Sequence, residues 1–297
     1  MIKKNLLLTG AKGQLASTFY SLFEKSPLRR KFNLHKVDIE DFDLADPHSM
    51  LTVLSSCLPS LILNCGAFTA VDRAEDSQEL AQRVNDESVA LMSKWSAENG
   101  CQLIHISTDF VFDGSKGTPY QPGDQTNPLG VYGHTKLSGE RHVLRLLSQN
   151  GIIIRTSWLY SNFGQNFVKT MLKLMVEGDV INVVNDQIGS PTSAYSLSRV
   201  LMRIIERDEQ LGGVFHWCDG ASISWYEFAT EIQRCAHKHG ILQREVQLLP
   251  ISTSSYLTKA RRPSYSVLDR SETVARLNAE ETEWKAELDK VISAIAN

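Results

Sequence analysis

The sequence lacks long apolar runs, paired cysteine motifs and an export signal. No stretch approaches the roughly 18 to 20 apolar residues that a membrane-spanning helix requires. Its five cysteines form no CxxC pair, so we expect reduced thiols and neither a disulfide framework nor a metal site. Residues 1–5 lead into a short apolar run without the apolar core and cleavage site of a signal peptide. These absences favour a cytoplasmic protein with no membrane partner.

A large charge of one sign is also absent. The 297 residues include 31 Lys and Arg against 34 Asp and Glu, a formal net charge of -3. Such a balance produces no global field that would attract nucleic acid or an anionic membrane. We therefore expect a small molecule as the partner. The chain is also longer than a typical single domain.

Short apolar runs alternate with helical patterns through the first half of the sequence. Continuous apolar strands separated by helices are typical of a parallel sheet that helices cover on both faces. The pattern predicts an α/β protein with a doubly wound parallel Rossmann sheet and a smaller, discontinuous C-terminal substrate domain. The expected strands are 6–8, a run ending at Val37, 61–63, 102–106 and 152–154, and the expected helices lie near 14–25, 47–57, 77–99 and 131–149.

The second half has shorter strands and more turn residues. We expect its segments to cover the carboxyl ends of the sheet strands, where such folds bind ligands. Residues 1–160 and 190–212 are assigned to the dinucleotide-binding domain, and 161–189 and 213–297 to the substrate-binding domain. The expected elements are helices near 166–177, 194–207, 225–239 and 284–295, strands at 180–184 and 214–217, and a turn-rich loop at 186–192.

A glycine turn follows the first expected strand. Gly10, Gly13 and Ala16 are spaced three and three between a strand and a helix. In dinucleotide-binding proteins the first glycine permits a tight turn, and the second lets backbone N–H groups approach a pyrophosphate at the helix N-terminus. Such a turn can also hold glycines for geometry alone. Its place at the start of a βα alternation favours the phosphate-binding interpretation.

Acidic residues follow the second expected strand. Asp38 stands roughly where a carboxylate accepts from the adenosine ribose, although a solvated carboxylate at a strand end is equally consistent. Asp43 and Leu44 suit the adenine amino group and ring face, but Asp43 can also simply lead into the following helix. The choice between NADH and NADPH stays open, because Asp38 disfavours a 2′-phosphate whereas Lys12 and Lys36 attract one.

A tyrosine, a lysine and a threonine form the candidate catalytic group. Tyr132 and Lys136 stand four residues apart in an expected helix and share one of its faces. Reduction of a ketone needs a proton donor, and a free phenol with a pKa of about 10 is a sluggish one. We expect Lys136 to lower that pKa and to hold the nicotinamide ribose. Thr108, at the end of an apolar strand, can orient the substrate carbonyl toward Tyr132, although loop capping is the structural alternative.

Longer motifs resemble the extended short-chain dehydrogenase/reductase superfamily and, within it, the dTDP-4-dehydrorhamnose reductase family. They cover residues 6 to about 265, nearly the whole chain. The motifs at 155–160 and 185–192 are much more specific than the glycine turn. The full set is NCGAFTAVD at 64–72, STDFVF at 107–112, NPLGVYG at 127–133, RTSWLY at 155–160, NFVKTM at 166–171, NDQIGSPT at 185–192 and Arg262 with Pro263.

The resemblance implies an NADPH- or NADH-dependent oxidoreductase that passes hydride to C4 of a nucleotide-linked 4-keto-6-deoxy sugar, giving dTDP-L-rhamnose. Tyr132 would be the proton donor, Lys136 its modulator and Thr108 the carbonyl partner. Asp109 and Trp158 would contact the substrate, although Trp158 can equally be a core residue, and Arg262 would bind the diphosphate. Besides Gly10 and Asp38, the implied cofactor contacts are Gly13, Gln14, Leu15, Asp43, Leu44, Ala67, Thr69, Tyr132 and Lys136.

Two departures from the family pattern affect these expectations. Phe110 replaces the tyrosine that usually follows Ser-Thr-Asp, so a hydroxyl that could contact the substrate is missing. Some family members dimerise through magnesium held by glutamates at positions that here are Thr18 and Tyr195. Neither residue is an attractive magnesium ligand, so we expect a monomer or a weak homodimer without a bridging metal.

Two other functions remain open at this stage. The regulatory NADP-binding subunit of methionine adenosyltransferase resembles the chain across the same motifs, although the intact Thr108, Tyr132 and Lys136 argue against a purely regulatory role. A nucleotide-sugar epimerase, or a reductase for a different 6-deoxyhexose, is the second alternative. Tightly retained NAD would indicate an epimerase, and exchangeable NAD(P)H a reductase.

Overall fold

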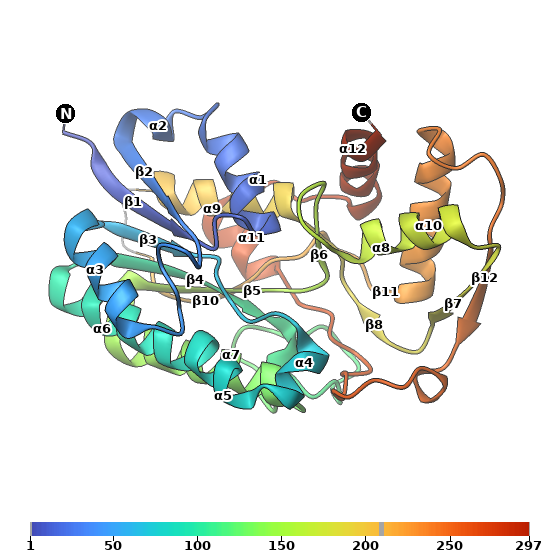
Figure 1. Cartoon of the computed structure of the whole chain (residues 1–297), viewed down its shortest axis with the longest axis horizontal. Coiled ribbons are helices and arrows are strands. Elements are labelled where there is room, and N and C mark those ends of the chain that lie inside the picture. The colour runs from blue at the N-terminus through green and yellow to red at the C-terminus, as the bar shows by residue number, and fades with distance from the viewer. Residues whose placement is uncertain (1, 208–210, 297) are drawn as a thin grey trace.

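The computed structural model describes residues 2–207 and 211–296, so positions 1, 208–210 and 297 of the expected domains lie outside the described residues. Six parallel strands form the main sheet, in the order β10-β5-β4-β3-β1-β2 (Figure 1). The doubly wound parallel sheet expected from the sequence is thereby confirmed. The strands are β1 (Lys4–Thr9), β2 (Phe32–Val37), β3 (Leu61–Asn64), β4 (Gln102–Thr108), β5 (Gly151–Thr156) and β10 (Gly213–His216).

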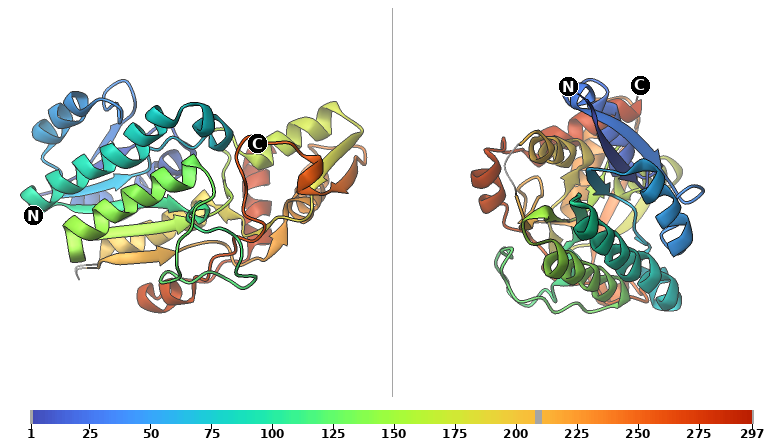
Figure 2. Two further views of the ribbon diagram at one scale, coloured as in Figure 1. Left: turned by 90° about the horizontal axis from the view of Figure 1, so that it is seen from below. Right: turned by 90° about the vertical axis from the view of Figure 1, so that its left-hand side faces the viewer.

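Helices cover both faces of this sheet. Leu6 and Leu8 belong to the core on one face and Leu7 to the core on the other, as the alternation of side chains along a strand requires. Burying each such leucine contributes about 1.5 to 3 kcal/mol. Figure 2 shows α6 and α7 side by side on one face. The first face is covered by α1 (Gln14–Phe23), α9 (Ala194–Glu206) and α11 (Ser271–Leu277), and the second by α3 (Pro47–Cys57), α6 (Ser88–Asn99) and α7 (Val131–Leu147).

A second unit lies beside the sheet (Figure 1). Its core surrounds the rings of Tyr160, Phe228 and Trp284. The helix α10 (Trp225–Lys238) starts at a capping box, in which Ser224 accepts from the Glu227 N–H and the Glu227 carboxylate accepts from the Ser224 N–H. The other elements of this unit are α8 (Phe167–Glu177), α12 (Trp284–Ala296), β7 (Val180–Val184) paired with β12 (Gln247–Ile251), and the short strands β6 (Leu159–Tyr160), β8 (Ile188–Gly189), β9 (Thr192–Ser193) and β11 (Ile223–Ser224).

The expected boundaries between the two units were wrong at residue 213 and also at 159–160 and 192–193, which form β6 and β9 of the second unit. β10 pairs in parallel with β5, through Val214 beside Ile153 and Phe215 beside Ile154. α11 also packs on the sheet, where Leu277 joins its core. Residues 213–216 and 271–277 therefore belong with the sheet and not with the second unit. The prediction failed because a hydrophobic pattern does not show which edge of a sheet a short strand joins.

The helix expected over 77–99 is interrupted. It consists of α5 (Gln78–Gln82), a π-helical segment η1 (Arg83–Glu87) and α6. The π segment turns Asn85 inward, where its amide oxygen accepts from Phe68 N at 2.9 Å and its nitrogen donates to Phe68 O at 3.0 Å. A π bulge often marks a functional region. Here it anchors the loop after β3, which continues into the short α4 (Val71–Asp76).

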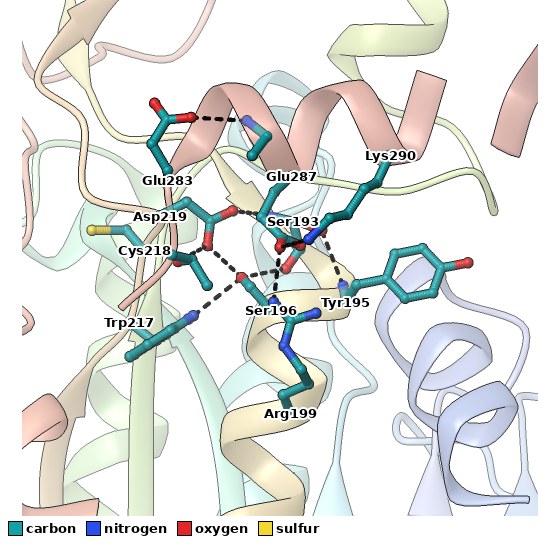
Figure 3. A network of polar contacts seen from close by, with 12 residues as sticks. Ser193, Tyr195, Ser196, Arg199, Trp217, Cys218, Asp219, Glu283, Glu287 and Lys290 are labelled. Atoms are coloured by element: carbon teal, nitrogen blue, oxygen red, sulfur yellow. Dashed lines mark hydrogen bonds and ion pairs between the residues drawn. The ribbon is translucent and has the colours of Figure 1, made fainter. Parts of the chain in front are cut away.

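A buried polar network joins the sheet to the second unit (Figure 3). Asp219, which follows β10, accepts hydrogen bonds from Ser193 N at 2.7 Å, from Ser196 Oγ and from Thr282 Oγ1 at 2.8 Å. Glu287 of α12 accepts from Arg199 of α9 at 2.9 Å. These contacts fix α9 relative to the segment that leads into α12.

Candidate active site

A cavity of about 1340 Å³ lies at the carboxyl ends of the sheet strands, with lining residues from both units. Every site residue expected from the sequence lines it. They are Gly10, Gly13, Gln14, Leu15, Asp38, Asp43, Leu44, Ala67, Thr69, Thr108, Asp109, Tyr132, Lys136, Trp158 and Arg262. This gathering follows from the topology, because the carboxyl ends of parallel strands meet at one edge of the sheet.

The glycine turn forms one wall of the cavity. Gly10 has a φ of 63°, and a Cβ there would lie 2.8 Å from Gly66 Cα, so both the backbone angle and the space require glycine. Gly13 N donates to Gly10 O at 2.9 Å and leads into α1. Within the described residues, no side chain caps the N-terminus of α1. Its first N–H groups are therefore available to an anion.

The acidic residues after β2 lie beside Lys12 of the glycine turn, whereas Lys36 belongs to β2 itself. The Asp38 carboxylate accepts from Lys12 N at 2.6 Å and from Ile39 N at 2.9 Å. The Lys12 ammonium forms an exposed ion pair with Glu40. Lys36 instead lies 3.7 Å from the centroid of the Tyr20 ring and is not part of the cavity lining. Of the two lysines, only Lys12 is therefore placed to meet a 2′-phosphate.

The adenine candidates lie beside this turn. Asp43 accepts from Ala45 N at 2.8 Å through Oδ1, while Asp46 caps α3 by accepting from His48 N at 2.9 Å. The Leu44 side chain packs so closely on Gly66 that a Cβ at Gly66 would lie 2.8 Å from its Cδ1. Asp43 thus shapes the local turn and also faces the cavity.

Thr108, Tyr132 and Lys136 meet deeper in the cavity. Thr108 ends β4, and Tyr132 and Lys136 lie on the first turns of α7. The helix approaches the Thr108 segment closely, since a Cβ on Gly133 would lie 2.2 Å from Phe110 O. The Phe110 ring contacts Tyr132 edge-on, with 5.6 Å between the centroids. Gly133 does not line the cavity, but it lets α7 pack against the segment after Thr108, a positioning role that the sequence did not reveal.

The pKa of Tyr132 differs from the sequence-based expectation. Burial raises it to about 12, partly offset by a hydrogen bond with Thr108. Burial also lowers the pKa of Lys136 to about 8. The Lys136 ammonium donates to Ile106 O at 2.7 Å and lies 3.1 Å from His105 Nε2. Burial of the phenol outweighs any lowering of its pKa by Lys136, whose ammonium is hydrogen-bonded to β4, so the role of Lys136 toward the phenol stays a prediction.

A buried ion pair lies next to the end of β4 that carries Thr108. Arg155 of β5 forms three hydrogen bonds to the Glu140 carboxylate of α7, the shortest of 2.6 Å. Ser107, the neighbour of Thr108, donates to the same carboxylate. Removing one partner of such a pair would leave a buried charge and cost about 3 to 5 kcal/mol. The ion pair and the Ser107 bond therefore connect α7, β4 and β5 next to Thr108.

Asp109 is a buried carboxylate beside Thr108. It is 2% exposed, and burial raises its pKa to about 6. Thr108 Oγ1 donates to its Oδ1 at 3.1 Å, and the nearby Ser266 hydroxyl partly offsets the rise in its pKa, whereas no donor within residues 2–207 and 211–296 meets its Oδ2 with good hydrogen-bond geometry. An acceptor of this kind suits a ligand hydroxyl.

Trp158 is half-buried and stacks on Trp225. The two indole centroids are 3.5 Å apart with 12° between the ring planes. Trp158 also has a φ of 45°, unusual for a bulky residue, and its ring packs on Gly189. One face of Trp158 is therefore covered by Trp225, a cavity residue of the second unit that sequence analysis did not single out.

Arg262 enters the cavity wall paired with Asp72. Its Nη2 donates to Asp72 Oδ2 at 2.7 Å, and Asp72 also accepts from Ala260 N at 3.0 Å. Arg73 and Arg83 line the same cavity. The described residues contain no group of three or more His, Cys, Asp or Glu side chains arranged to hold a metal ion. No helix in the described ranges combines the length and apolarity needed to cross a membrane.

The fold and this site together define the extended class of short-chain dehydrogenases and reductases, with a dinucleotide-type turn and a Thr, Tyr and Lys group in one cavity. The family model described as the RmlD substrate binding domain matches residues 4–297. A curated relative from Aggregatibacter actinomycetemcomitans, named dTDP-4-dehydrorhamnose reductase, is 34% identical and covers 96% of this chain and 97% of its own. The chain belongs to the dTDP-4-dehydrorhamnose reductase family.

Solved structures agree with this assignment. The dTDP-4-dehydrorhamnose reductase from Clostridium acetobutylicum superposes with a TM-score of 0.90 at 35% identity, covering 99% of this chain and 100% of that one. The protein of the same name from Bacillus anthracis, solved in complex with NADP, has a TM-score of 0.88 at 32% identity and covers 98% and 99%. The family suggested by the sequence motifs is thus confirmed.

Proposed function

We propose that this protein reduces the C4 ketone of dTDP-4-dehydro-β-L-rhamnose to dTDP-L-rhamnose with NADPH or NADH, the last step in making this nucleotide sugar. The proposal is carried by the cavity that joins the glycine turn to Thr108, Tyr132 and Lys136. Its volume of about 1340 Å³ exceeds that of a pocket for one small ligand, about 300 to 1000 Å³, and suits two ligands side by side. The names of the relatives and the NADP complex of the Bacillus anthracis protein support it.

The residues at the glycine turn suit a dinucleotide. The free N–H groups of α1 favour a pyrophosphate, and Gly13, the second glycine of the turn, lets the backbone approach it. Asp38 and Asp43 offer acceptors at the adenosine end, and Lys136 offers donors to a ribose hydroxyl at the other. When bound, the dinucleotide supplies the hydride.

The residues of the chain itself manage the carbonyl oxygen. When the ketone binds, the Thr108 hydroxyl turns its single proton from Asp109 to the carbonyl oxygen and so orients the ketone. Tyr132 then transfers its phenolic proton to the oxygen that becomes the C4 hydroxyl. The Lys136 ammonium then stabilises the phenolate until a proton is regained. Asp109 accepts from a sugar hydroxyl through its free oxygen, and Arg262 binds the diphosphate.

The direct test mixes purified protein with dTDP-4-dehydro-β-L-rhamnose and NADPH or NADH, and follows cofactor absorbance together with product identity. Substrate-dependent oxidation that yields dTDP-L-rhamnose supports the proposal and ranks the cofactors. Cofactor binding without turnover of this substrate contradicts it and favours another keto sugar or a regulatory NADP-binding role. Tightly retained NAD with interconversion of sugar epimers favours an epimerase.

A further inference from the structure

Lys136 has a buried neighbour to which the proposed reaction assigns no role. His105 lies on β4, three residues before Thr108, and its Nε2 is 3.1 Å from Lys136 Nζ. The side chain of His105 is fully buried, and Lys136 is 2% exposed. The only other hydrogen-bond partner of Nζ in the described chain is the Ile106 carbonyl, at 2.7 Å. His105 therefore supplies half of the hydrogen bonding of this amine.

A row of side chains across the sheet holds the His105 ring. Thr9, Asn64 and His105 occupy paired positions on β1, β3 and β4, so they share one level and one face of the sheet. The Asn64 amide lies 3.0 Å from His105 Nδ1 and 2.6 Å from Thr9 Oγ1. Thr9 Oγ1 in turn accepts from Gly66 N at 3.2 Å. The row thus connects the lysine to the backbone that faces Gly10.

The charges in this row determine where the histidine proton lies. Burial lowers the pKa of His105 well below its usual range, so the ring is neutral. Burial lowers the pKa of Lys136 only to about 8, so its ammonium form dominates at pH 7. An ammonium group has donors and no acceptor. Nε2 must then be the unprotonated nitrogen, and the ring proton lies on Nδ1.

The Asn64 amide meets this requirement. Its oxygen and nitrogen can exchange places without moving the other heavy atoms, so the oxygen can face the Nδ1 proton and the nitrogen can face Thr9. Besides Tyr132, one turn earlier on α7, the other ionisable groups that face Lys136 are Glu140, one turn further along α7, and Cys65, after β3. Glu140 is already paired with Arg155.

We propose that His105 is a positioning residue, which holds the Lys136 ammonium through its unprotonated Nε2 so that the lysine serves Tyr132 and the cofactor ribose. The catalytic consequence rests on the proposed reductase function, whereas the contact itself does not. His105→Gln and His105→Asn form a matched pair. A glutamine amide reaches the position of Nε2 and keeps an acceptor for Lys136, while an asparagine amide ends near the position of Nδ1 and keeps only the contact with Asn64.

Two measurements on the ligand-free protein test the contact. Long-range proton–nitrogen NMR spectra should show His105 as the neutral Nδ1–H tautomer at pH 7. Titration of protein labelled with ¹³C at lysine Cε, assigned with Lys136→Met, should give His105→Gln a Lys136 pKa within a few tenths of wild type. His105→Asn should lower that pKa by about one unit, because a hydrogen bond to the charged form is lost. An Nε2–H tautomer, or the same Lys136 pKa in His105→Asn as in wild type, would overturn the proposal.

Kinetics test the consequence. The alkaline limb of kcat/KM should move down with the Lys136 pKa in His105→Asn, and kcat at pH 6 should fall about tenfold from lost orientation, while His105→Gln stays near wild type. The same alkaline limb of kcat/KM and the same kcat in His105→Asn and wild type, after correction for the folded fraction, would show that His105 has only a packing role. If the wild-type protein does not reduce the keto sugar, the proposed function fails, and the NMR titration still decides the contact. If both variants fail to fold, the wild-type tautomer decides it.

Discussion

The phenol of Tyr132 is the residue on which the proposed proton transfer depends. A pKa of about 12 keeps the proton on the phenol at neutral pH, which suits an acid more than a base. The alkoxide that forms at C4 is a stronger base than a phenolate, so the transfer proceeds without a lower phenol pKa. Lys136 then matters for the phenolate that remains, and its orientation becomes more important than its effect on the resting phenol.

Tyr132→Phe should lower kcat about 10²- to 10⁴-fold while leaving the affinity for NADPH nearly unchanged, because only the proton donor is removed. Tyr256→Phe is the matched control, since Tyr256 is 55% exposed and lies outside the cavity lining. Steady-state kinetics and fluorescence titration with NADPH measure the two effects. Wild-type turnover by Tyr132→Phe would exclude the assigned role.

Glu40 should influence the choice between NADH and NADPH. Its carboxylate neutralises Lys12, and Asp38 lies in the same turn, so the site disfavours a 2′-phosphate. Glu40→Gln frees the ammonium of Lys12. At low salt it should therefore raise the ratio of the dissociation constant for NADH to that for NADPH by about threefold to tenfold.

The exposed Glu98 on α6, which lies outside the cavity lining, provides the control for this shift. Glu98→Gln should leave the ratio unchanged. Added salt should reduce the effect of Glu40→Gln, because both groups of the Lys12 pair are exposed. An unchanged cofactor ratio in Glu40→Gln at low salt would show that the pair does not set the preference.

At the scale of elements, the connection of α9 to the second unit depends on a carboxylate buried at Asp219 (Figure 3). Burial raises its pKa to about 6, above the value of 3.8 for a free aspartate. The folded state therefore holds this proton more tightly than the unfolded state. The stabilisation that comes from protonating Asp219 is complete below about pH 4 and is lost as the pH rises through 6.

Asp219→Asn removes this titration. The stability of the variant relative to wild type should improve by about 2 to 3 kcal/mol between pH 4 and pH 7, whatever the offset caused by its altered hydrogen bonds. Urea unfolding at several pH values measures the difference. Ser55→Ala, at an exposed position without an ionisable group, should show no such trend. A flat difference for Asp219→Asn would mean that Asp219 titrates normally in the fold.

At the scale of the whole molecule, the cavity lies between two units with separate cores. The sheet supplies the glycine turn and the catalytic group, while Trp225 comes from the second unit and Arg262 from the segment after β12. Only the assembled fold therefore presents both ends of the site. A substitution that weakens the contacts between the sheet and the second unit should therefore lower the affinity for the substrate more than the affinity for the dinucleotide.

We expect no metal-bridged dimer. Thr18 is buried on α1 and donates to Gln14 O at 2.7 Å, and Tyr195 donates to Asn162 Oδ1 at 3.1 Å, so neither presents a carboxylate. Light scattering after size-exclusion chromatography should give the same mass with magnesium and with EDTA. A mass that halves on chelation would contradict this expectation.

Much of the fold followed from local pattern. The apolar runs and helical patterns placed α3 and α10 almost to the residue. The structure shows local start signals at both helices, a cap by Asp46 before Pro47 in α3 and a capping box of Ser224 with Glu227 in α10. The π segment at 83–87 left no such signal, since its geometry is decided by the contact of Asn85 with the loop after β3. β10 was misassigned because its neighbour β5 is distant in sequence.

Local periodicity and motifs were enough to predict the succession of strands and helices along the chain, the family, and the residue types that meet in the cavity. The electrostatics of the cavity depend instead on the folded arrangement. Burial raises the pKa of Tyr132, bonding to Ile106 and His105 turns Lys136 toward β4, and Glu40 neutralises Lys12. These effects come from solvent exclusion and from partners far apart in the chain, which a linear pattern does not encode.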